Sequence, residues 1–333
     1  MSSLTQKLLR LVEAFPKAQV LVVGDLILDT YLECRAVGVA AEAPIPFLEI
    51  SGQTHALGGA ANVAHNLAGL GVKTTLVGRI GMDREGEILH RLVEEAGIEF
   101  YPFGTASPTT RKTRVQASGH YYLRFDEEDT TPLDPPQIQA LSQTLSEAME
   151  RSQLLLVSDY DKGVLKNGFV DCLESIAESR GLRIVGDVKP QNIRQWRNLH
   201  CISPNLSEAK NLYSQLRPSS TCPSENLELA RELGQILSLN VVLTLAEKGM
   251  TVSNSAGDSQ SFPALCSAPK SVTGAGDTVL ATLAAALSCK ADLFDAALLA
   301  NLAAALAVGH PGTYAVAAEE LSGVIQNLET NDL

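Results

Sequence analysis

The sequence lacks an apolar run of the roughly 20 residues that a membrane-crossing helix requires. Its first segment, residues 1–17, has the spacing of an amphipathic helix and no apolar signal-peptide core. We therefore expect a cytoplasmic protein with no membrane partner. Basic residues are also few, because 26 Lys and Arg stand against 38 Asp and Glu and give a net charge of −12. This excess repels nucleic acids at long range, so we expect no nucleic acid as a partner.

Cysteines and histidines are not spaced like metal ligands. The six cysteines include no Cys-x-x-Cys pair, and the six histidines include no His-x-x-x-His pair. We expect reduced structural thiols and no metal-histidine site. The hydrophobic content of 45% is enough to build a large buried core, which favours a globular protein.

Short β-prone runs alternate with segments of helix length. This alternation predicts an α/β fold, with a parallel sheet covered by helices on both faces. Ligands bind such sheets at the carboxyl ends of the strands. The β-prone runs are residues 19–23, 74–77, 154–157, 183–186 and 241–245. The polar residues at or just beyond their ends are Asp25, Ser158, Asp159, Asp187 and Thr244.

The most informative segment runs from Ser271 to Thr278 and places Asp277 after small residues at the start of a predicted helix. Glycine and alanine let backbone amides approach an anion, and a helix N-terminus adds about half a positive charge. The residues predicted to stabilise a phosphoryl group and to take a proton from a hydroxyl are Gly274, Ala275, Gly276 and Asp277. The pattern indicates a kinase that acts on a hydroxyl group. The alternative is that this turn only caps a helix.

A second glycine turn, Gly58-Gly59-Ala60-Ala61-Asn62, also leads into a predicted helix of small residues. Together, the two turns resemble the two signatures of the ribokinase-like (PfkB) carbohydrate kinases, and the resemblance extends over residues 19–322. Within that family the sequence most resembles the heptose-7-phosphate kinases of lipopolysaccharide precursor synthesis. The segments that carry this closer resemblance are residues 23–31, 42–46, 158–163, 187–190 and 203–208.

The resemblance implies a three-layer α/β/α, Rossmann-like ribokinase fold in a single domain over residues 1–333. Two regions that break the strand–helix rhythm, about 31–57 and 109–126, would form a small β-sheet lid over the sugar. The second region also has the pattern of a hairpin with its turn at Ser118-Gly119. In the family this lid often makes dimer contacts, which implies a homodimer through the lid. The alternative is a decorated edge of the main sheet.

For the acceptor sugar, the resemblance implies that Asp25 and Asp29 bind hydroxyls while Gly58, Gly59 and Asn62 line the floor. Asp25 could instead cap a helix. A phosphorylated acceptor would also need nearby cations, and arginine suits phosphate best. The candidate cations are Lys112, Arg114, Arg124, Lys162 and Lys189, each of which could equally be a solvated surface charge.

For the nucleotide, Asn205 and Glu208 match the family's Asn-x-x-Glu motif, which organises Mg²⁺ through water. The same residues also have the spacing of a helix capping box. The resemblance implies that ATP is the co-substrate and that Asn301 lies beside its adenine, although a buried structural asparagine is the alternative. The remaining residues implied along the nucleotide are Thr244, Glu247 and Gly249, together with Gly274 and Gly276.

Three residues depart from the family pattern. Ser271 replaces an aspartate associated with a monovalent cation, so we expect K⁺ activation to be weak or absent. Ala246 replaces a glycine in the nucleotide loop, which would narrow that pocket slightly. Tyr122 replaces a polar amide in the lid, which leaves the identity of the sugar open.

We therefore expect an ATP- and Mg²⁺-dependent kinase that phosphorylates the anomeric hydroxyl of D-glycero-D-manno-heptose 7-phosphate, for ADP-heptose and lipopolysaccharide core synthesis. The nucleotidyltransferase that is fused to some heptose enzymes would be a separate protein. Alternatives are another PfkB-type kinase, such as a ribokinase, fructokinase or adenosine kinase, or a non-catalytic sugar-binding regulator. Intact Asp277 argues against the regulator.

Overall fold

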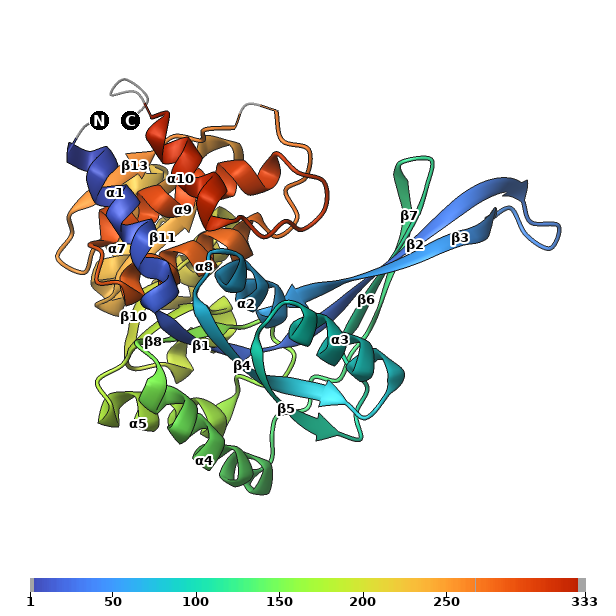
Figure 1. The fold of residues 1–333 in the computed structure, drawn as a ribbon, viewed down its shortest axis with the longest axis horizontal. Coiled ribbons are helices and arrows are strands. Elements are labelled where there is room, and N and C mark those ends of the chain that lie inside the picture. The colour runs from blue at the N-terminus through green and yellow to red at the C-terminus, as the bar shows by residue number, and fades with distance from the viewer. Residues whose placement is uncertain (1–2, 267, 329–333) are drawn as a thin grey trace.

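The computed structural model describes residues 3–266 and 268–328, which form one large and one small β-sheet with helices around the large one (Figure 1). No helix within these residues is long and apolar enough to cross a membrane. The helices are α1 (Ser3–Ala14), α2 (Ala60–Gly69), α3 (Arg84–Glu95), α4 (Pro135–Arg151), α5 (Asn167–Ser179), α6 (Leu206–Leu216), α7 (Asn226–Leu237), α8 (Ala275–Ser288), α9 (Leu293–Val308) and α10 (Ala318–Gln326), with 3-10 turns η1 (Phe15–Lys17), η2 (Pro190–Gln195) and η3 (Ala246–Lys248).

The large sheet has nine strands in the order β13-β12-β11-β10-β9-β8-β1-β4-β5. Every neighbouring pair from β11 to β5 is parallel, whereas β12 and β13 add antiparallel strands at one edge. This arrangement confirms the predicted α/β fold. The strands are β1 (Gln19–Gly24), β4 (Lys73–Gly81), β5 (Glu99–Thr105), β8 (Leu154–Ser158), β9 (Arg183–Asp187), β10 (Leu199–Ile202), β11 (Asn240–Thr244), β12 (Met250–Ser253) and β13 (Ser259–Phe262).

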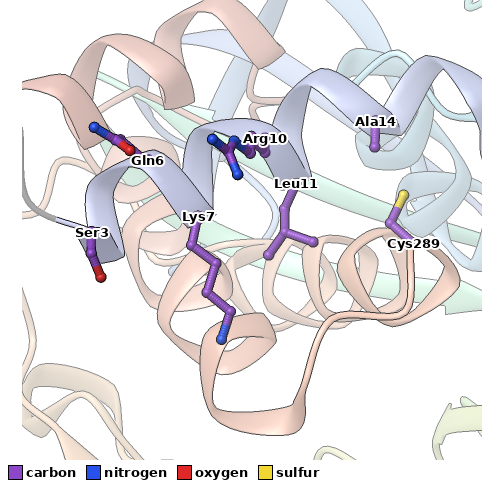
Figure 2. Close-up of a pocket in the computed structure, with 7 residues that line it drawn as sticks. All are labelled: Ser3, Gln6, Lys7, Arg10, Leu11, Ala14 and Cys289. Carbon is purple, nitrogen blue, oxygen red and sulfur yellow. The ribbon is translucent and has the colours of Figure 1, made fainter.

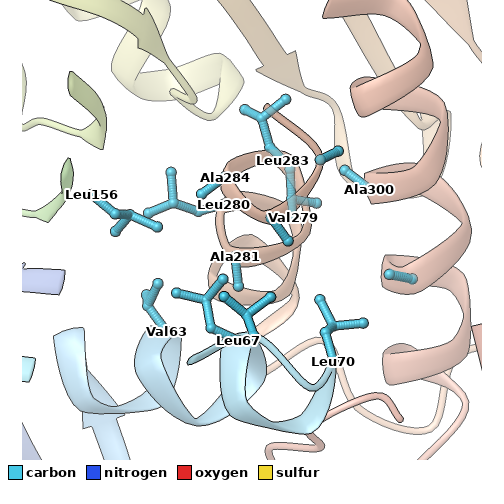
Figure 3. Packing of buried hydrophobic residues seen from close by; sticks show 14 of the residues in the cluster. Val63, Leu67, Leu70, Leu156, Val279, Leu280, Ala281, Leu283, Ala284 and Ala300 are labelled. Atoms are coloured by element: carbon cyan, nitrogen blue, oxygen red, sulfur yellow. The ribbon is translucent and has the colours of Figure 1, made fainter. Parts of the chain in front are cut away.

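Two hydrophobic clusters fill the spaces on the two faces of the large sheet. Alternate residues of β1 enter different clusters, as the two-residue period of a strand requires: Val20 and Val22 face one, and Leu21 and Val23 face the other. The first cluster includes residues of α1, α2, α3, α8, α9 and α10, and the second includes residues of α4 to α7. Figure 3 shows the first cluster where α2 packs against α8. The result is a three-layer α/β/α arrangement.

The small sheet consists of β2 (Leu26–Val39), β3 (Pro46–Gly59), β6 (Arg111–Ala117) and β7 (His120–Glu127), in the order β3-β2-β6-β7. It extends away from the helices and the large sheet as two long hairpins (Figure 1). The segments predicted as a lid therefore form a sheet of their own and are not a decorated edge of the large sheet. Ser118 and Gly119 have φ values of 53° and 79°, which suit a two-residue hairpin turn between β6 and β7, as predicted.

Candidate active site

The carboxyl ends of β1 and β8 lie at the point where the strand order of the large sheet reverses. Strand β1 pairs with β4 on one side and with β8 on the other. The two ends are very close, because a Cβ on Gly24 would lie 2.1 Å from the carbonyl oxygen of Ser158. Asp25 and Asp159 follow directly, and open α/β sheets bind ligands in the crevice at such a point. The structure thus brings together strand ends that the sequence could only place one by one.

The two glycine turns meet where α2 and α8 begin. The side-chain amide of Asn62 in α2 donates a 2.6 Å hydrogen bond to Oδ2 of Asp277 in α8. One turn further along α2, the side chain of Asn66 accepts a 2.8 Å hydrogen bond from the hydroxyl of Thr278 and donates to the carbonyl of Asn62. These polar contacts hold the N-terminus of α8 in a defined place against α2.

Asp277 also accepts a 2.8 Å hydrogen bond at Oδ1, from the hydroxyl of Tyr160. Burial raises the pKa of Asp277 to about 6, although the hydrogen bonds from Asn62 and Tyr160 favour the charged form. The negative charge of Asp29 raises this pKa further, and Lys189 lowers it. A carboxylate with such a pKa is mostly ionised at neutral pH and is a stronger base than an ordinary aspartate.

The turn before Asp277 leaves open space at the start of α8. Gly274 has φ of 80°, and a Cβ there would lie 3.0 Å from the amide nitrogen of Asn62, so the backbone requires glycine. A Cβ on Gly276 would meet nothing within 4 Å, and its backbone does not need positive φ. The N–H groups in the first turn of a helix have no partner within the helix. Backbone donors beside open space suit the oxygens of a phosphate.

Asp25 has a different role from the expected one. It is 1% exposed, and its carboxylate accepts hydrogen bonds from the N–H groups of Tyr160, Lys162 and Val164, at 2.8, 3.0 and 3.2 Å. Burial raises its pKa, and these three bonds oppose the shift. The carboxylate therefore stabilises the loop after β8 and is not open to a sugar. This also differs from the helix-cap alternative, because the donors belong to a loop far along the chain.

Asp29 lies near the start of β2, where the chain passes from β1 of the large sheet into the small sheet. It is 6% exposed, and its Oδ1 forms a 2.5 Å ion pair with Arg114 of β6.

The two glycines expected to line the floor of the sugar site are required by the packing of the protein itself. A Cβ on Gly58 would lie 2.6 Å from the carboxylate of Asp29, and Gly59 has φ of 59° with the carbonyl of Asp25 close by.

All five basic residues proposed for the acceptor phosphate pair with carboxylates. Arg124 is the most exposed, with 59% of its side chain accessible, whereas the other four are at most 21% exposed. They are therefore not freely solvated charges, except for Arg124. The pairs are Arg114–Asp29 (2.5 Å), Lys112–Asp126 (3.2 Å), Arg124–Asp126 (3.2 Å), Lys162–Glu128 (2.6 Å) and Lys189–Glu208 (2.6 Å).

Asn205 and Glu208 form the capping box that their spacing allowed. The side chain of Asn205 accepts from the N–H of Glu208, and Oε2 of Glu208 accepts from the N–H of Asn205, both at 3.0 Å. The other oxygen of Glu208 binds Lys189. Thr244 ends β11 beside this cap, and its N–H donates to the carbonyl of Pro204. The capping alternative is thus confirmed, and it leaves the proposed metal role open.

The loop after β11 contains the other residues expected along the nucleotide. Gly249 has φ of 88°, and a Cβ there would lie 2.1 Å from the carbonyl oxygen of Phe262. Glu247 is exposed in η3. Ala246 has φ of 52°, a left-handed conformation that costs a residue with a Cβ about 1 kcal/mol. This is the position where the family pattern has glycine.

Asn301 is held by the protein itself. It is 5% exposed, and its side-chain amide donates a 2.8 Å hydrogen bond to the carbonyl of Pro263. This contact favours the structural alternative for Asn301, which ties α9 to the segment that follows β13. An open cleft of about 680 Å³ lies along the same helix and is lined in part by Leu302, Ala305 and Leu265.

A second pocket, of about 440 Å³, lies between α1 and the residue that follows α8 (Figure 2). Its lysine, Lys7, is paired with Asp292 and Asp295, and Arg10 also lines the pocket. Cys289 marks the C-terminal end of α8, about 20 Å along the helix from its N-terminus. This pocket is therefore separate from Asp277.

Several oxygen donors surround the ammonium group of Lys189. Among residues 3–266 and 268–328 no three Asp, Glu, His or Cys side chains are grouped to hold a metal ion. Near Glu208, Asp187 has a buried Oδ1 with no hydrogen-bond partner among the described residues. Burial and the charge of Glu208 raise the pKa of Asp187, and Lys189 opposes them. A few oxygen ligands fit a cation such as Mg²⁺, which keeps several waters and takes other ligands from phosphates.

Sequence interpretation missed the position of Tyr160. It lay in one of the segments that carried the resemblance, yet no role was assigned to it. The structure places its hydroxyl on the same carboxylate that Asn62 binds. A detectable signal was present, because Tyr160 follows two polar residues, Ser158 and Asp159, at the end of a strand predicted to reach the site.

Comparison with known proteins agrees with this geometry. Residues 17–320 match the family described as pfkB family carbohydrate kinase. The chain belongs to the pfkB family of carbohydrate kinases. It is therefore an ATP-dependent sugar kinase, as the sequence predicted.

The chain is similar in sequence to curated relatives and similar in fold to solved structures. The chain is 35% identical over 305 residues to the bifunctional protein HldE of Syntrophotalea carbinolica. The matched region covers 90% of this chain but only 61% of the length of HldE. Its fold is similar to phosphofructokinase-2 of Escherichia coli in complex with substrates and products, with a TM-score of 0.77, 18% identity and coverage of 93% and 99% of the two chains. The fold is also similar to Arabidopsis thaliana ribokinase complexed with ribose and ATP, with a TM-score of 0.72 and 17% identity. This match covers 93% of the present chain and 99% of the ribokinase chain. The ribokinase-like fold is thereby confirmed.

Proposed function

We propose that this carbohydrate kinase phosphorylates the anomeric hydroxyl of D-glycero-D-manno-heptose 7-phosphate. The product would be the 1,7-bisphosphate, a precursor for ADP-heptose and the lipopolysaccharide core. Support for this acceptor comes from the motifs that resemble heptose-7-phosphate kinases and from the 35% identity to a protein named HldE. Because the chain spans 61% of that relative, the proposal concerns only a kinase activity. We propose the cytoplasm as its location, since ATP is available there.

The observation that carries the proposed chemistry is the placement of Asp277 at the start of α8, between Asn62 and Tyr160. The acceptor O–H would give its proton to Asp277 while the acceptor oxygen forms a bond to the γ-phosphorus of ATP. The bond from that phosphorus to the bridging oxygen breaks, and ADP leaves with the electron pair. The N–H group of Gly276 would stabilise the transferring group, and the N–H group of Ala275 would join it by giving up its 3.3 Å hydrogen bond to the carbonyl of Val272.

On the acceptor side, we propose that Asp29 binds a sugar hydroxyl and that Arg114 both orients Asp29 and attracts the 7-phosphate. Lys112 is two residues before Arg114 on β6, so both side chains lie on one face of the small sheet. When the phosphate binds, Lys112 and Arg114 would weaken their ion pairs with Asp126 and Asp29 and contact the phosphate oxygens instead. Asp25 is left out of the acceptor site because its carboxylate already holds three backbone N–H groups.

On the donor side, we propose that Glu208 and Asn205 hold Mg²⁺ through water while Thr244, Glu247 and Gly249 lie along the nucleotide. A bound Mg²⁺ would neutralise charge on the phosphates. We propose weak or absent K⁺ activation, because Ser271 offers a hydroxyl in place of a carboxylate and already accepts a hydrogen bond from the N–H of Thr273.

We also propose a homodimer through the small sheet. Large apolar side chains on this sheet are exposed in the single chain, including Val39 at 71%, Ile50 at 65% and Leu123 at 58%. Clusters of exposed apolar side chains usually mark an interaction surface. A second copy is the proposed partner because the corresponding lid often makes dimer contacts in the family.

The experiment that tests the acceptor is an ATP-consumption screen over free and phosphorylated pentoses, hexoses, heptoses and nucleosides. We expect heptose 7-phosphate to give the highest kcat/KM by far, with one ADP formed for each phosphate transferred. Faster turnover of a free pentose, hexose or nucleoside would assign another acceptor. Absence of transfer to every sugar, despite ATP and sugar binding, would favour a regulator.

A further inference from the structure

Tyr160 contacts the carboxylate expected to act as the base, and it does so from the opposite side to Asn62. Its hydroxyl donates a 2.8 Å hydrogen bond to Oδ1 of Asp277, while the amide of Asn62 donates to Oδ2 at 2.6 Å. A carboxylate oxygen has two acceptor positions, so each oxygen keeps one for the incoming proton. Two donors on two oxygens fix the rotation of the carboxylate group.

The backbone beneath Tyr160 is held by two buried aspartates. Asp25 accepts from the N–H groups of Tyr160, Lys162 and Val164, as described above. Asp159 accepts from the N–H groups of Asp161 and Lys189 at 2.8 and 3.2 Å, and it is 1% exposed. Burying two carboxylates is unfavourable unless such hydrogen bonds compensate. The loop is therefore more rigid than an ordinary surface loop.

The ring of Tyr160 has a second neighbour on the nucleotide side. The ammonium of Lys189 lies 5.4 Å from the ring centroid, within the range of a cation–π contact. Lys189 in turn pairs with Glu208 at 2.6 Å. Tyr160 thus lies between the carboxylate at the start of α8 and the polar groups at the start of α6.

We propose that Tyr160 is a positioning residue for Asp277, holding the carboxylate in the orientation that accepts the proton of the sugar hydroxyl. This inference rests on the proposed role of Asp277 as the base. It explains why two buried aspartates, Asp25 after β1 and Asp159 after β8, hold the loop that carries Tyr160, a cost that sugar binding by Asp25 does not explain. Tyr160 would act through Asp277 and need not touch the sugar.

The hydrogen bond has a predicted effect on the titration of the base. It stabilises the charged form of Asp277, so its loss should raise the pKa of Asp277. Three other charged groups face Asp277. Asp29 raises the pKa of Asp277 and Lys189 lowers it, while Asp277 itself raises the pKa of Asp187. None of these side chains is changed when the hydroxyl of Tyr160 is removed.

The test is Tyr160→Phe, which removes the hydroxyl and keeps the ring beside Lys189. We expect kcat to fall about tenfold, with little change in the KM for ATP, because orientation of the base is lost while nucleotide contacts remain. The acid limb of the kcat–pH profile should move to higher pH by about one unit. The matched control is Tyr213→Phe, because Tyr213 is 4% exposed and, like Tyr160, donates to a carboxylate: Glu232 accepts at 2.7 Å, between α6 and α7.

A kcat and a pH profile in Tyr160→Phe equal to those of Tyr213→Phe would overturn the inference. A double-mutant cycle gives an independent check: in the Asp277→Asn background, Tyr160→Phe should lower the residual rate by less than twofold, because the base it orients is absent. A full tenfold loss in that background would show that Tyr160 acts by another route. If the wild-type protein transfers phosphate to no sugar, the proposed function itself fails, which is a different result from an unchanged Tyr160→Phe.

Discussion

Asn62 and Asp277 lie 215 residues apart in the chain, and the amide of one donates a 2.6 Å hydrogen bond to the carboxylate of the other. This contact joins the first turn of α2 to the first turn of α8. The two glycine signatures are therefore two halves of one site.

Asp277→Asn should retain the shape of the turn and the affinity for ATP but lose about 10²–10⁴-fold in kcat, the usual contribution of a positioned general base. The N–H groups of Ala275 and Gly276 remain, so residual transfer is expected. Single-turnover phosphoryl transfer and calorimetric ATP binding would be measured together. Near-native transfer would show that another residue takes the proton.

The kcat of the wild-type protein should fall about tenfold per pH unit below pH 6, because burial raises the pKa of Asp277 to about 6 and only its charged form accepts a proton. The profile should be measured with both substrates saturating, so that titration of the substrate phosphates affects KM and not kcat. An ordinary aspartate would keep full activity down to about pH 4. A flat profile between pH 4.5 and pH 7 (roughly the useful range) would contradict the raised pKa.

Asp277→Asn should also change the pH dependence of stability. The folded pKa of about 6 lies above the unfolded value, so folding disfavours the charged form, and this cost appears as pH rises from about 4 to 6. Removing the charge should make the variant more stable than the wild type by about 3 kcal/mol at pH 8, from a pKa shift of roughly two units, and by close to nothing at pH 4. Urea unfolding at both pH values measures the difference. A difference independent of pH would point to changed packing.

Gly276→Ala should fold normally and bind ATP poorly, because its Cβ would enter the open space at the start of α8 where phosphate oxygens are expected. We expect kcat/KM for ATP to fall by about 100-fold and the melting temperature to stay within about 2 °C. Gly274→Ala is the informative comparison, since φ of 80° and the nearby Asn62 amide make it destabilising. Equal loss of stability in both variants would contradict this assignment of open space.

Val39→Glu combined with Ile50→Glu should convert the proposed dimer into a monomer. Both side chains are exposed on the small sheet, at 71% and 65%, so the charges cost the single chain little. Light scattering after size-exclusion chromatography would measure the mass. Met82→Glu is the control, because Met82 is 79% exposed but follows β4 of the large sheet. A monomeric wild type, or an unchanged dimer in the double variant, would rule out this interface.

Local sequence signals predicted the elements of the fold better than the partners of its polar residues. The apolar run at residues 154–157 predicted a strand, and the structure has β8 at Leu154–Ser158. The run is apolar throughout because both faces of this strand are buried. The hairpin at Ser118-Gly119 was also predictable from its turn residues.

The partners of the site residues depend on contacts between distant segments, which spacing along one chain does not reveal. The family resemblance assigned Asp25 to the sugar, whereas the N–H groups that bind its carboxylate belong to a loop more than a hundred residues further on. For the same reason, the sequence did not reveal the contact of Tyr160 with Asp277, because the two residues lie 117 positions apart. Asn205 and Glu208 were predictable as a capping box because their partners lie three residues apart.

The connectivity of the small sheet has a consequence for how the protein folds. Strands β2 and β6 are parallel neighbours, yet β3, α2, β4, α3 and β5 lie between them in the sequence. The ion pair between Asp29 and Arg114 closes a loop of 85 residues. Long loops of this kind are slow to close, so pairing of β2 with β6 should follow the packing of β4 and β5 onto β1. The hydrogen bond between Asn62 and Asp277 closes a far longer loop, of 215 residues, so the two glycine turns should meet only after the small sheet has formed, and the chain would gain its catalytic carboxylate last.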